Sequence, residues 1–136
     1  VQVVLISDAA PPLIYGTGTA GTIGVPAISL AAPACLGVTT QIQGSNILAN
    51  AGTFVVMNLA DDNSSIFGIT ALVQSVCAAV IYVQAGGSGL VALPFSVPNN
   101  PAFDNLYIFT QIIPVDPVGP MGLAATPGMR FRICLL

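Results

Sequence analysis

The stretch Leu106–Val115, which reads LYIFTQIIPV, decides the fold class of this chain. It is built mostly from β-branched and aromatic residues, which are enriched in β-strands, and it contains no charged residue. Towards the C-terminus Met129, Phe131 and Ile133 alternate with two arginines and a cysteine, which is the period of a strand with one buried face. Both segments predict strands, and the first of them is largely apolar on both faces.

Other runs share this strand-like composition, namely Val1–Ile6, Val38–Gln43, Thr53–Leu59, Cys77–Val83 and Leu90–Val97. Clusters of turn-forming residues separate them at residues 60–65, 85–89, 98–101 and 114–120. Short strands with turns at this spacing predict an all-β fold: an antiparallel β-sandwich of about seven to nine strands, jelly-roll-like or Ig-like, with an N-terminal β-strand extension. A short helix is expected in one place, within residues 66–76.

Charge is scarce, and this excludes several function classes. Of the 136 residues, 54% are hydrophobic and 5% are charged, with five acidic residues, two basic residues and no histidine. Two basic residues cannot neutralise a run of phosphates, so nucleic-acid binding is excluded. The lack of histidine removes imidazole bases and imidazole metal ligands. Disorder is excluded as well, because disordered chains are poor in apolar residues.

The apolar segments are too short to cross a membrane as helices. A spanning helix needs about 20 consecutive apolar residues, and the best candidate, residues 69–83, is interrupted by Gln74 and Ser75. Residues 9–60 and 63–103 nevertheless contain no charged residue. Large exposed apolar patches mark interfaces, so we expect a homo-oligomer or homopolymer whose subunits cover one another. The alternative is an unusually apolar monomer with a surface of Thr, Asn, Gln and Ser.

The first fourteen residues are interpreted as an extension and residues 15–136 as the β-sandwich domain. The extension starts with an uncharged, β-prone assembly arm made of Val1, Gln2, Val3, Val4, Leu5, Ile6 and Ser7. Pro11 and Pro12 follow as a stiff hinge. One interpretation is a donor strand that adds to a sheet edge of the next subunit and so builds a filament. The other is that this segment is the first strand of its own sandwich.

The last predicted strand carries two further candidates for assembly. Arg130 and Arg132 either form ion pairs with aspartates of a neighbouring subunit or simply solubilise an exposed face. Cys134 either forms an inter-subunit disulfide or pairs internally with Cys35 or Cys77. The odd number of cysteines leaves one of these three without an internal partner.

No arrangement of residues predicts catalysis, a metal or a cofactor. Serines and threonines have no histidine or lysine to act as a base. The acidic cluster at residues 61–64 lacks the spacing and the distal glutamate of a calcium loop, and a solvated turn is expected there. Residues 63–65 match a glycosylation sequon, with Asn63 as the acceptor. We expect no enzyme, no cofactor and no small-molecule substrate.

A series of short motifs from residue 15 onward resembles a known pattern. They are YGTGTAG (15–21), PACLG (33–37), VCAAV (76–80), PNNP (98–101), YIFTQ (107–111), DP (116–117) and GLAATPG (122–128). Their order resembles a poorly characterised family of small β-rich domains in secreted bacterial proteins, often placed at the C-terminus of larger extracellular chains. The match covers residues 15–134. It implies a β fold and secretion, and no enzymatic activity.

Two departures from that pattern matter. Many relatives carry a cysteine in the opening glycine motif where this chain has Thr19, so a disulfide from that position to Cys77 is not available in that form. Cys35 or Cys134 would have to replace it. In addition, residues 1–14 precede the family pattern, so the domain is expected to be complete without the assembly arm.

These observations together predict a secreted structural subunit. It would self-assemble into an extracellular filament, sheath or surface layer, by strand addition of the assembly arm and burial of apolar faces. We expect it at the cell surface or outside the cell, after removal of a signal peptide. An adhesin or carbohydrate-binding module is the alternative, although only three tyrosines and no tryptophan are present to stack on sugars. A jelly-roll viral capsid subunit is a second alternative.

Overall fold

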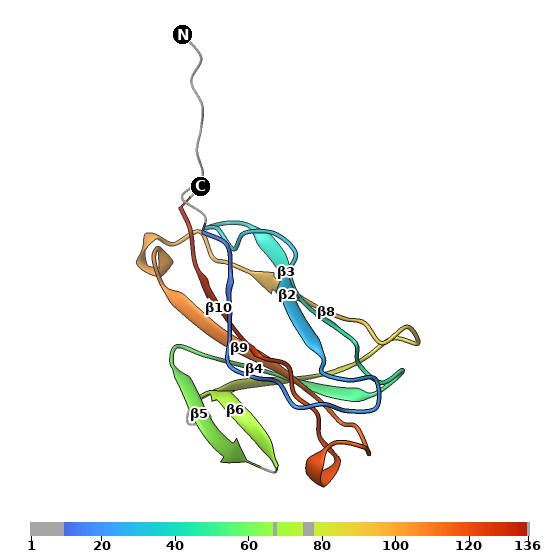
Figure 1. The fold of residues 1–136 in the computed structure, drawn as a ribbon. Coiled ribbons are helices and arrows are strands. Elements are labelled where there is room, and N and C mark those ends of the chain that lie inside the picture. The colour runs from blue at the N-terminus through green and yellow to red at the C-terminus, as the bar shows by residue number, and fades with distance from the viewer. Residues whose placement is uncertain (1–9, 67, 75–77, 136) are drawn as a thin grey trace.

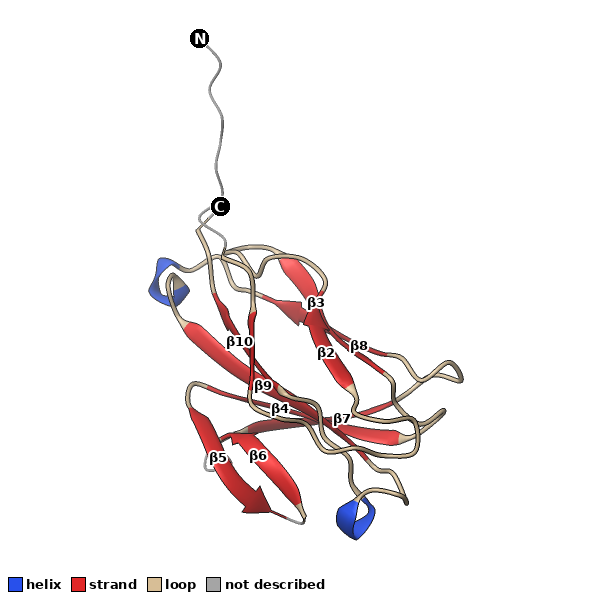
Figure 2. Ribbon diagram, in the orientation of Figure 1, coloured by secondary structure: helices blue, strands red, loops and turns tan. Residues whose placement is uncertain are grey.

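The predicted all-β fold is confirmed. A computed structural model describes residues 10–66, 68–74 and 78–135, and these residues form ten strands in three antiparallel sheets (Figures 1 and 2). Their only helical segments are two short 3-10 turns, η1 (Pro101–Phe103) and η2 (Pro120–Gly122).

The largest sheet has five strands in the spatial order β1-β10-β9-β4-β7. Their bounds are β1 (Leu13–Tyr15), β10 (Gly128–Arg132), β9 (Tyr107–Pro114), β4 (Gly52–Asn58) and β7 (Ala79–Gln84). A second sheet has the order β2-β3-β8, with bounds β2 (Ala27–Leu30), β3 (Thr39–Ser45) and β8 (Val91–Ser96). The third is a hairpin of β5 (Asp61–Ile66) and β6 (Ile69–Val73).

The core lies between the five-stranded and three-stranded sheets. Successive side chains of a strand point to opposite faces, so each strand contributes alternate residues to this core. Ile42 of β3, Val55 of β4, Ile112 of β9 and Met129 of β10 are fully buried there. The predicted alternation of the last strand is confirmed, because Met129, Phe131 and Ile133 are all buried.

A third layer covers part of the other face of the five-stranded sheet. The β5–β6 hairpin packs against the outer faces of β4 and β9, and Ile69, Ala71 and Val73 of β6 are buried. Strand β9 is therefore sandwiched between the core and the hairpin. This explains why the decisive stretch is apolar on both faces, which a two-layer sandwich does not require.

Two local predictions are wrong. Residues 61–65 are not a turn but most of strand β5, and residues 69–73 are not helical but form strand β6. The two strands pair with each other, with Ser64 opposite Ala71 and Ile66 opposite Ile69. The polar residues of β5 resemble a turn because one side of the hairpin faces water. The sheet beneath it decides the strand conformation of β6.

The pairing scheme is nested for several strands. The first strand pairs with the last, β3 pairs with β8, and β4 pairs with β7. Such nesting resembles a jelly roll, while the β2–β3 and β9–β10 pairings depart from it. Strands β1 and β2, with three and four residues, are too short for their composition to have predicted them.

Two buried threonines provide a matched test of the core. Thr126 Oγ1 accepts a hydrogen bond from the Ile112 amide (3.0 Å) and donates one to the Pro127 carbonyl (2.7 Å). Thr110 Oγ1 is equally buried but has no hydrogen-bond partner among the described residues. We expect Thr126→Val to lower the free energy of unfolding by about 1–3 kcal/mol, and Thr110→Val to leave it unchanged or raise it by up to about 1 kcal/mol. Urea unfolding measures both, and an equal loss in the two variants would contradict this assignment.

Candidate functional site

The assembly arm, residues 1–7, lies outside the described residues, whereas its hinge is described. Pro11 is exposed and Pro12 is half-buried. With Ala10 they line a hollow of about 210 Å³, whose other wall is the loop Leu30–Pro33 after β2. The chain then enters β1, which spans the predicted boundary between residues 14 and 15 and pairs with the last strand.

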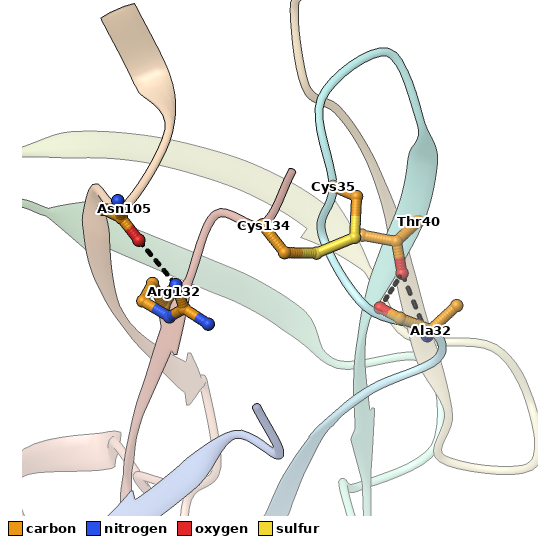
Figure 3. Close-up of a disulfide and its surroundings, with 6 residues drawn as sticks. All are labelled: Ala32, Cys35, Thr40, Asn105, Arg132 and Cys134. Carbon is orange, nitrogen blue, oxygen red and sulfur yellow. Dashed lines mark hydrogen bonds between the residues drawn. A yellow bond between two sulfur atoms is a disulfide. The ribbon is translucent and has the colours of Figure 1, made fainter. Parts of the chain in front are cut away.

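Of the cysteine alternatives, the internal pair is the one that forms. Cys35 and Cys134 are joined by a disulfide, and both are buried (Figure 3). The backbone on either side of it is paired as well, because the Leu36 amide donates to Cys134 O (2.8 Å) and the Cys134 amide donates to Ala34 O (3.0 Å). The Cys134 side chain therefore does not lie on the face that carries the two arginines. Its disulfide to Cys35 connects the end of the chain to the loop between β2 and β3 of the second sheet. Cys77 lies outside the described residues.

Both arginines have partners within the chain. The Arg130 guanidinium carbon lies 4.9 Å from the centre of the Tyr107 ring, which is a cation–π contact. Arg132 Nη1 donates to Asn105 Oδ1 at 2.5 Å (Figure 3). These contacts hold the side chains along the outer face of β10. They support the interpretation that the two arginines solubilise an exposed face of their own subunit.

The side chain of Gln111 joins the hairpin to the central sheet, a role that composition alone did not predict. Its Oε1 accepts from the Leu72 amide (3.0 Å), and its Nε2 donates to Thr70 O (2.9 Å) and Thr126 O (3.0 Å). The residue is 1% exposed. The sequence signal for this role is a single amide side chain within the apolar strand Leu106–Val115. Buried polar groups are generally hydrogen-bonded, so such a residue indicates a partner segment packed against the strand.

The opening glycine motif is held by a tyrosine and a leucine. Tyr15 donates its hydroxyl proton to Leu72 O at 2.5 Å. Gly16 has φ +71°, and a Cβ atom at this residue would lie 2.6 Å from Leu72 Cδ2. A side chain at residue 16 is therefore strained by the backbone conformation and would also have to displace the Leu72 methyl groups.

The last glycine of that motif, Gly21, meets the DP motif. The Asp116 carboxylate, 2% exposed, accepts from the Thr22 amide (2.7 Å), the Thr22 hydroxyl (2.7 Å) and the Val118 amide (3.0 Å). Burial acts to raise the pKa of Asp116, but these hydrogen bonds outweigh it and hold the pKa below its ordinary value. The position of a Cβ at Gly21 is occupied by this carboxylate. Two motifs about a hundred residues apart in sequence thus form one structural contact.

A polar cleft of about 460 Å³ opens between the glycine motif and the hairpin. Its lining is Tyr15, Gly16, Thr17, Asp61, Asp62, Asn63, Thr70 and Leu72. Burial and then the Asp61 carboxylate, opposed by Arg130, together raise the pKa of Tyr15 to about 12, so the hydroxyl remains protonated at neutral pH. No group of three or more potential metal-ligating side chains is present in the described residues. The cleft therefore offers hydrogen bonds and negative charge.

The β7 side of the molecule is apolar and open. Val80 and Tyr82 are 58% and 63% exposed on the outer face of β7. Beside Val80 lies an apolar cleft of about 200 Å³ beneath the hairpin, which we call the outer cleft. Beside Ala79, on the other face, lies a hollow of about 460 Å³ that we call the inner hollow. Composition predicted apolar patches but not their position.

Comparisons with family models, with curated proteins and with solved structures find no match to this chain. None of the described helical segments is long and apolar enough to cross a membrane. The geometry described above is therefore the basis for assigning a function.

The disulfide closes 99 residues of chain, and a loop of this size stabilises a fold by restricting the unfolded state. We expect the double variant Cys35→Ser/Cys134→Ser to lose about 2–5 kcal/mol of unfolding free energy. Dithiothreitol should lower the stability of the unsubstituted chain to the same value and leave the double variant unchanged. Gel bands that shift from dimer to monomer on reduction in a Cys77→Ser chain would instead show that Cys35 or Cys134 links subunits.

The Asp116 contact predicts a dependence on pH. Because its pKa is lowered on folding, its stabilisation is complete above the unfolded value of about 4 and is lost as the pH falls through the folded pKa. We expect Asp116→Asn to cost about 1–3 kcal/mol at pH 7, with the difference from the unsubstituted chain shrinking below about pH 4. Urea unfolding between pH 7 and pH 2 measures this. Asp61→Asn, at an exposed carboxylate, should change stability by less than about 0.5 kcal/mol at pH 7.

Proposed function

We propose that the protein is a structural subunit that self-assembles into an extracellular filament, sheath or surface layer. The observation that carries this proposal is the apolar, uncharged side of the molecule around β7, where a strand edge that is unpaired within the described residues lies beside exposed Val80 and Tyr82. Strand edges of this kind pair with other chains unless charge, proline or a covering element blocks them.

The hairpin reduces the apolar surface without removing it. It covers β4 and β9, yet Leu59 remains 59% exposed, Val118 69% and Met121 75%. Few charges oppose association of these surfaces, because Asp116 is buried and both arginines contact groups of their own subunit. A net charge of −3 is small enough to permit close packing of copies.

Secretion is part of the proposal. The Cys35–Cys134 disulfide suits an oxidising compartment, since structural disulfides are rare in reducing ones. The resemblance to β-rich domains of secreted bacterial proteins agrees with it. The residues of those motifs, among them Tyr15, Gln111 and Asp116, make structural contacts.

The polar cleft favours a second candidate, an adhesin or carbohydrate-binding module. Tyr15 supplies a ring, while Asp61, Asn63 and Thr70 supply groups that can hydrogen-bond to sugar hydroxyls. The cleft carries two of the five acidic residues, so its ligand would be a neutral sugar rather than an anionic one.

Light scattering over a concentration series, with negative-stain electron microscopy of the full chain, tests the first proposal. We expect uniform fibres or sheets whose mass grows with concentration, because apolar faces and strand edges are buried between copies. A monodisperse monomer at every concentration would overturn the proposal. Retention of such a monomer on a neutral polysaccharide matrix, lost on Asp61→Ala, would support the second candidate.

A further inference from the structure

We propose that the edge of β7, with the outer cleft and the inner hollow, is the acceptor site for the assembly arm, residues 1–7, of a second copy of this chain. This inference rests on the proposed function and adds the position of the contact and its occupant. The occupant is a strand without charge, added beside β7.

The hydrogen-bonding edge of β7 is open. The strand pairs with β4 on one side, from Gly52 opposite Gln84 to Met57 opposite Ala79, and it ends the five-stranded sheet on its other side within the described residues. It has six residues, close to the seven of the assembly arm, and its sequence AVIYVQ contains no charge or proline. None of the usual features that block strand addition is present in it.

The outer cleft suits one face of an added strand. Phe54, Val56 and Ile113 of the central sheet form its floor, and side chains of the hairpin form its roof. Among the described lining side chains Gln111 is the polar one, and its amide oxygen and nitrogen are engaged in hydrogen bonds within the chain. The outer cleft therefore offers apolar contact alone, and its volume of about 200 Å³ is enough for a large aliphatic side chain.

The inner hollow suits the other face. It lies between the two large sheets, with Met57, Ala79 and Ile108 on one side and Phe95 of β8 on the other. Since Ala79 and Val80 are adjacent in a strand, they point to opposite faces, and so do the two openings beside them. A strand added to β7 would contact apolar surface on both faces.

The assembly arm has the composition that this position requires. In an extended strand, Val1, Val3 and Leu5 would share one face with Ser7 at its end. Val4 and Ile6 would share the other face with Gln2 at its start. An ordinary strand with one solvated face would alternate apolar and polar residues. Two apolar faces match an acceptor that is open on both sides of its edge.

The topology favours contact between copies. The chain enters the five-stranded sheet at β1, and β7 is the opposite edge, four strand spacings or about 19 Å away. Figure 1 shows the β5–β6 hairpin, which roofs the outer cleft, at the end of the molecule far from where the described chain begins. Donor and acceptor at opposite edges make a heterologous contact, which generates a filament where successive copies do not close into a ring.

The test uses full-length chains with one charge introduced at a time. Val80→Asp and Val80→Lys place either sign of charge on the acceptor edge, and Leu5→Asp places a charge in the assembly arm. Ile23→Asp, at a residue 52% exposed in the turn between Gly21 and Gly24, is the matched control. We expect the control to polymerise like the unsubstituted chain, and the other three to lose polymer at least tenfold while retaining a cooperative urea transition.

Mixing the defective chains identifies donor and acceptor. A Val80→Asp chain keeps its assembly arm and a Leu5→Asp chain keeps its acceptor edge, so an equal mixture should give heterodimers and nothing larger by light scattering. Polymers of Val80→Asp or Leu5→Asp equal to those of the unsubstituted chain would overturn this acceptor site and leave the structural function standing. An unsubstituted chain that stays monomeric would overturn the structural function itself. A mixture without heterodimers would show that the assembly arm does not bind this edge in another copy.

Discussion

The fold depends on covering strand β9 on both of its faces. Its inner face closes the core through Ile112, and its outer face carries Gln111, whose side chain hydrogen-bonds to two backbone groups of β6 and to Thr126 O. A buried amide without these partners would be costly, so the hairpin must sit where it does. Three layers follow from this one requirement, and a domain with very few charges gains enough buried surface to be stable.

The recognisable motifs of the chain serve this architecture. Tyr15 ties the first strand to the hairpin, Asp116 ties the glycine motif to the loop after β9, and the Cys35–Cys134 disulfide ties the last strand to the second sheet. Each is a long-range contact near an end or a bend of the chain. The edge of β7 is one part of the described surface that these contacts do not cover, and this is where association between copies is proposed.

Most long strands were predictable because their β-branched and aromatic residues favour a strand and are also the residues that the sheets bury. The run Thr53–Leu59 became β4, and Leu106–Val115 became β9, within one residue at each end. Strands β5 and β6 were not predictable, since Asp, Asn and Ser resemble a turn and β6 is a strand only while it pairs and packs. The two openings beside β7 join side chains from distant elements, which no local pattern encodes.

The sequence by itself determined the all-β class, the absence of imidazole chemistry and the shortage of charge, because these depend on composition and on a period of two residues. It also left three cysteines with their pairing open. Only the tertiary structure decided that Cys35 meets Cys134, that both faces of β9 are covered within one subunit, and that β7 with exposed Val80 and Tyr82 ends the five-stranded sheet within the described residues. Those outcomes depend on which distant segments come together, and that is a property of packing rather than of local sequence.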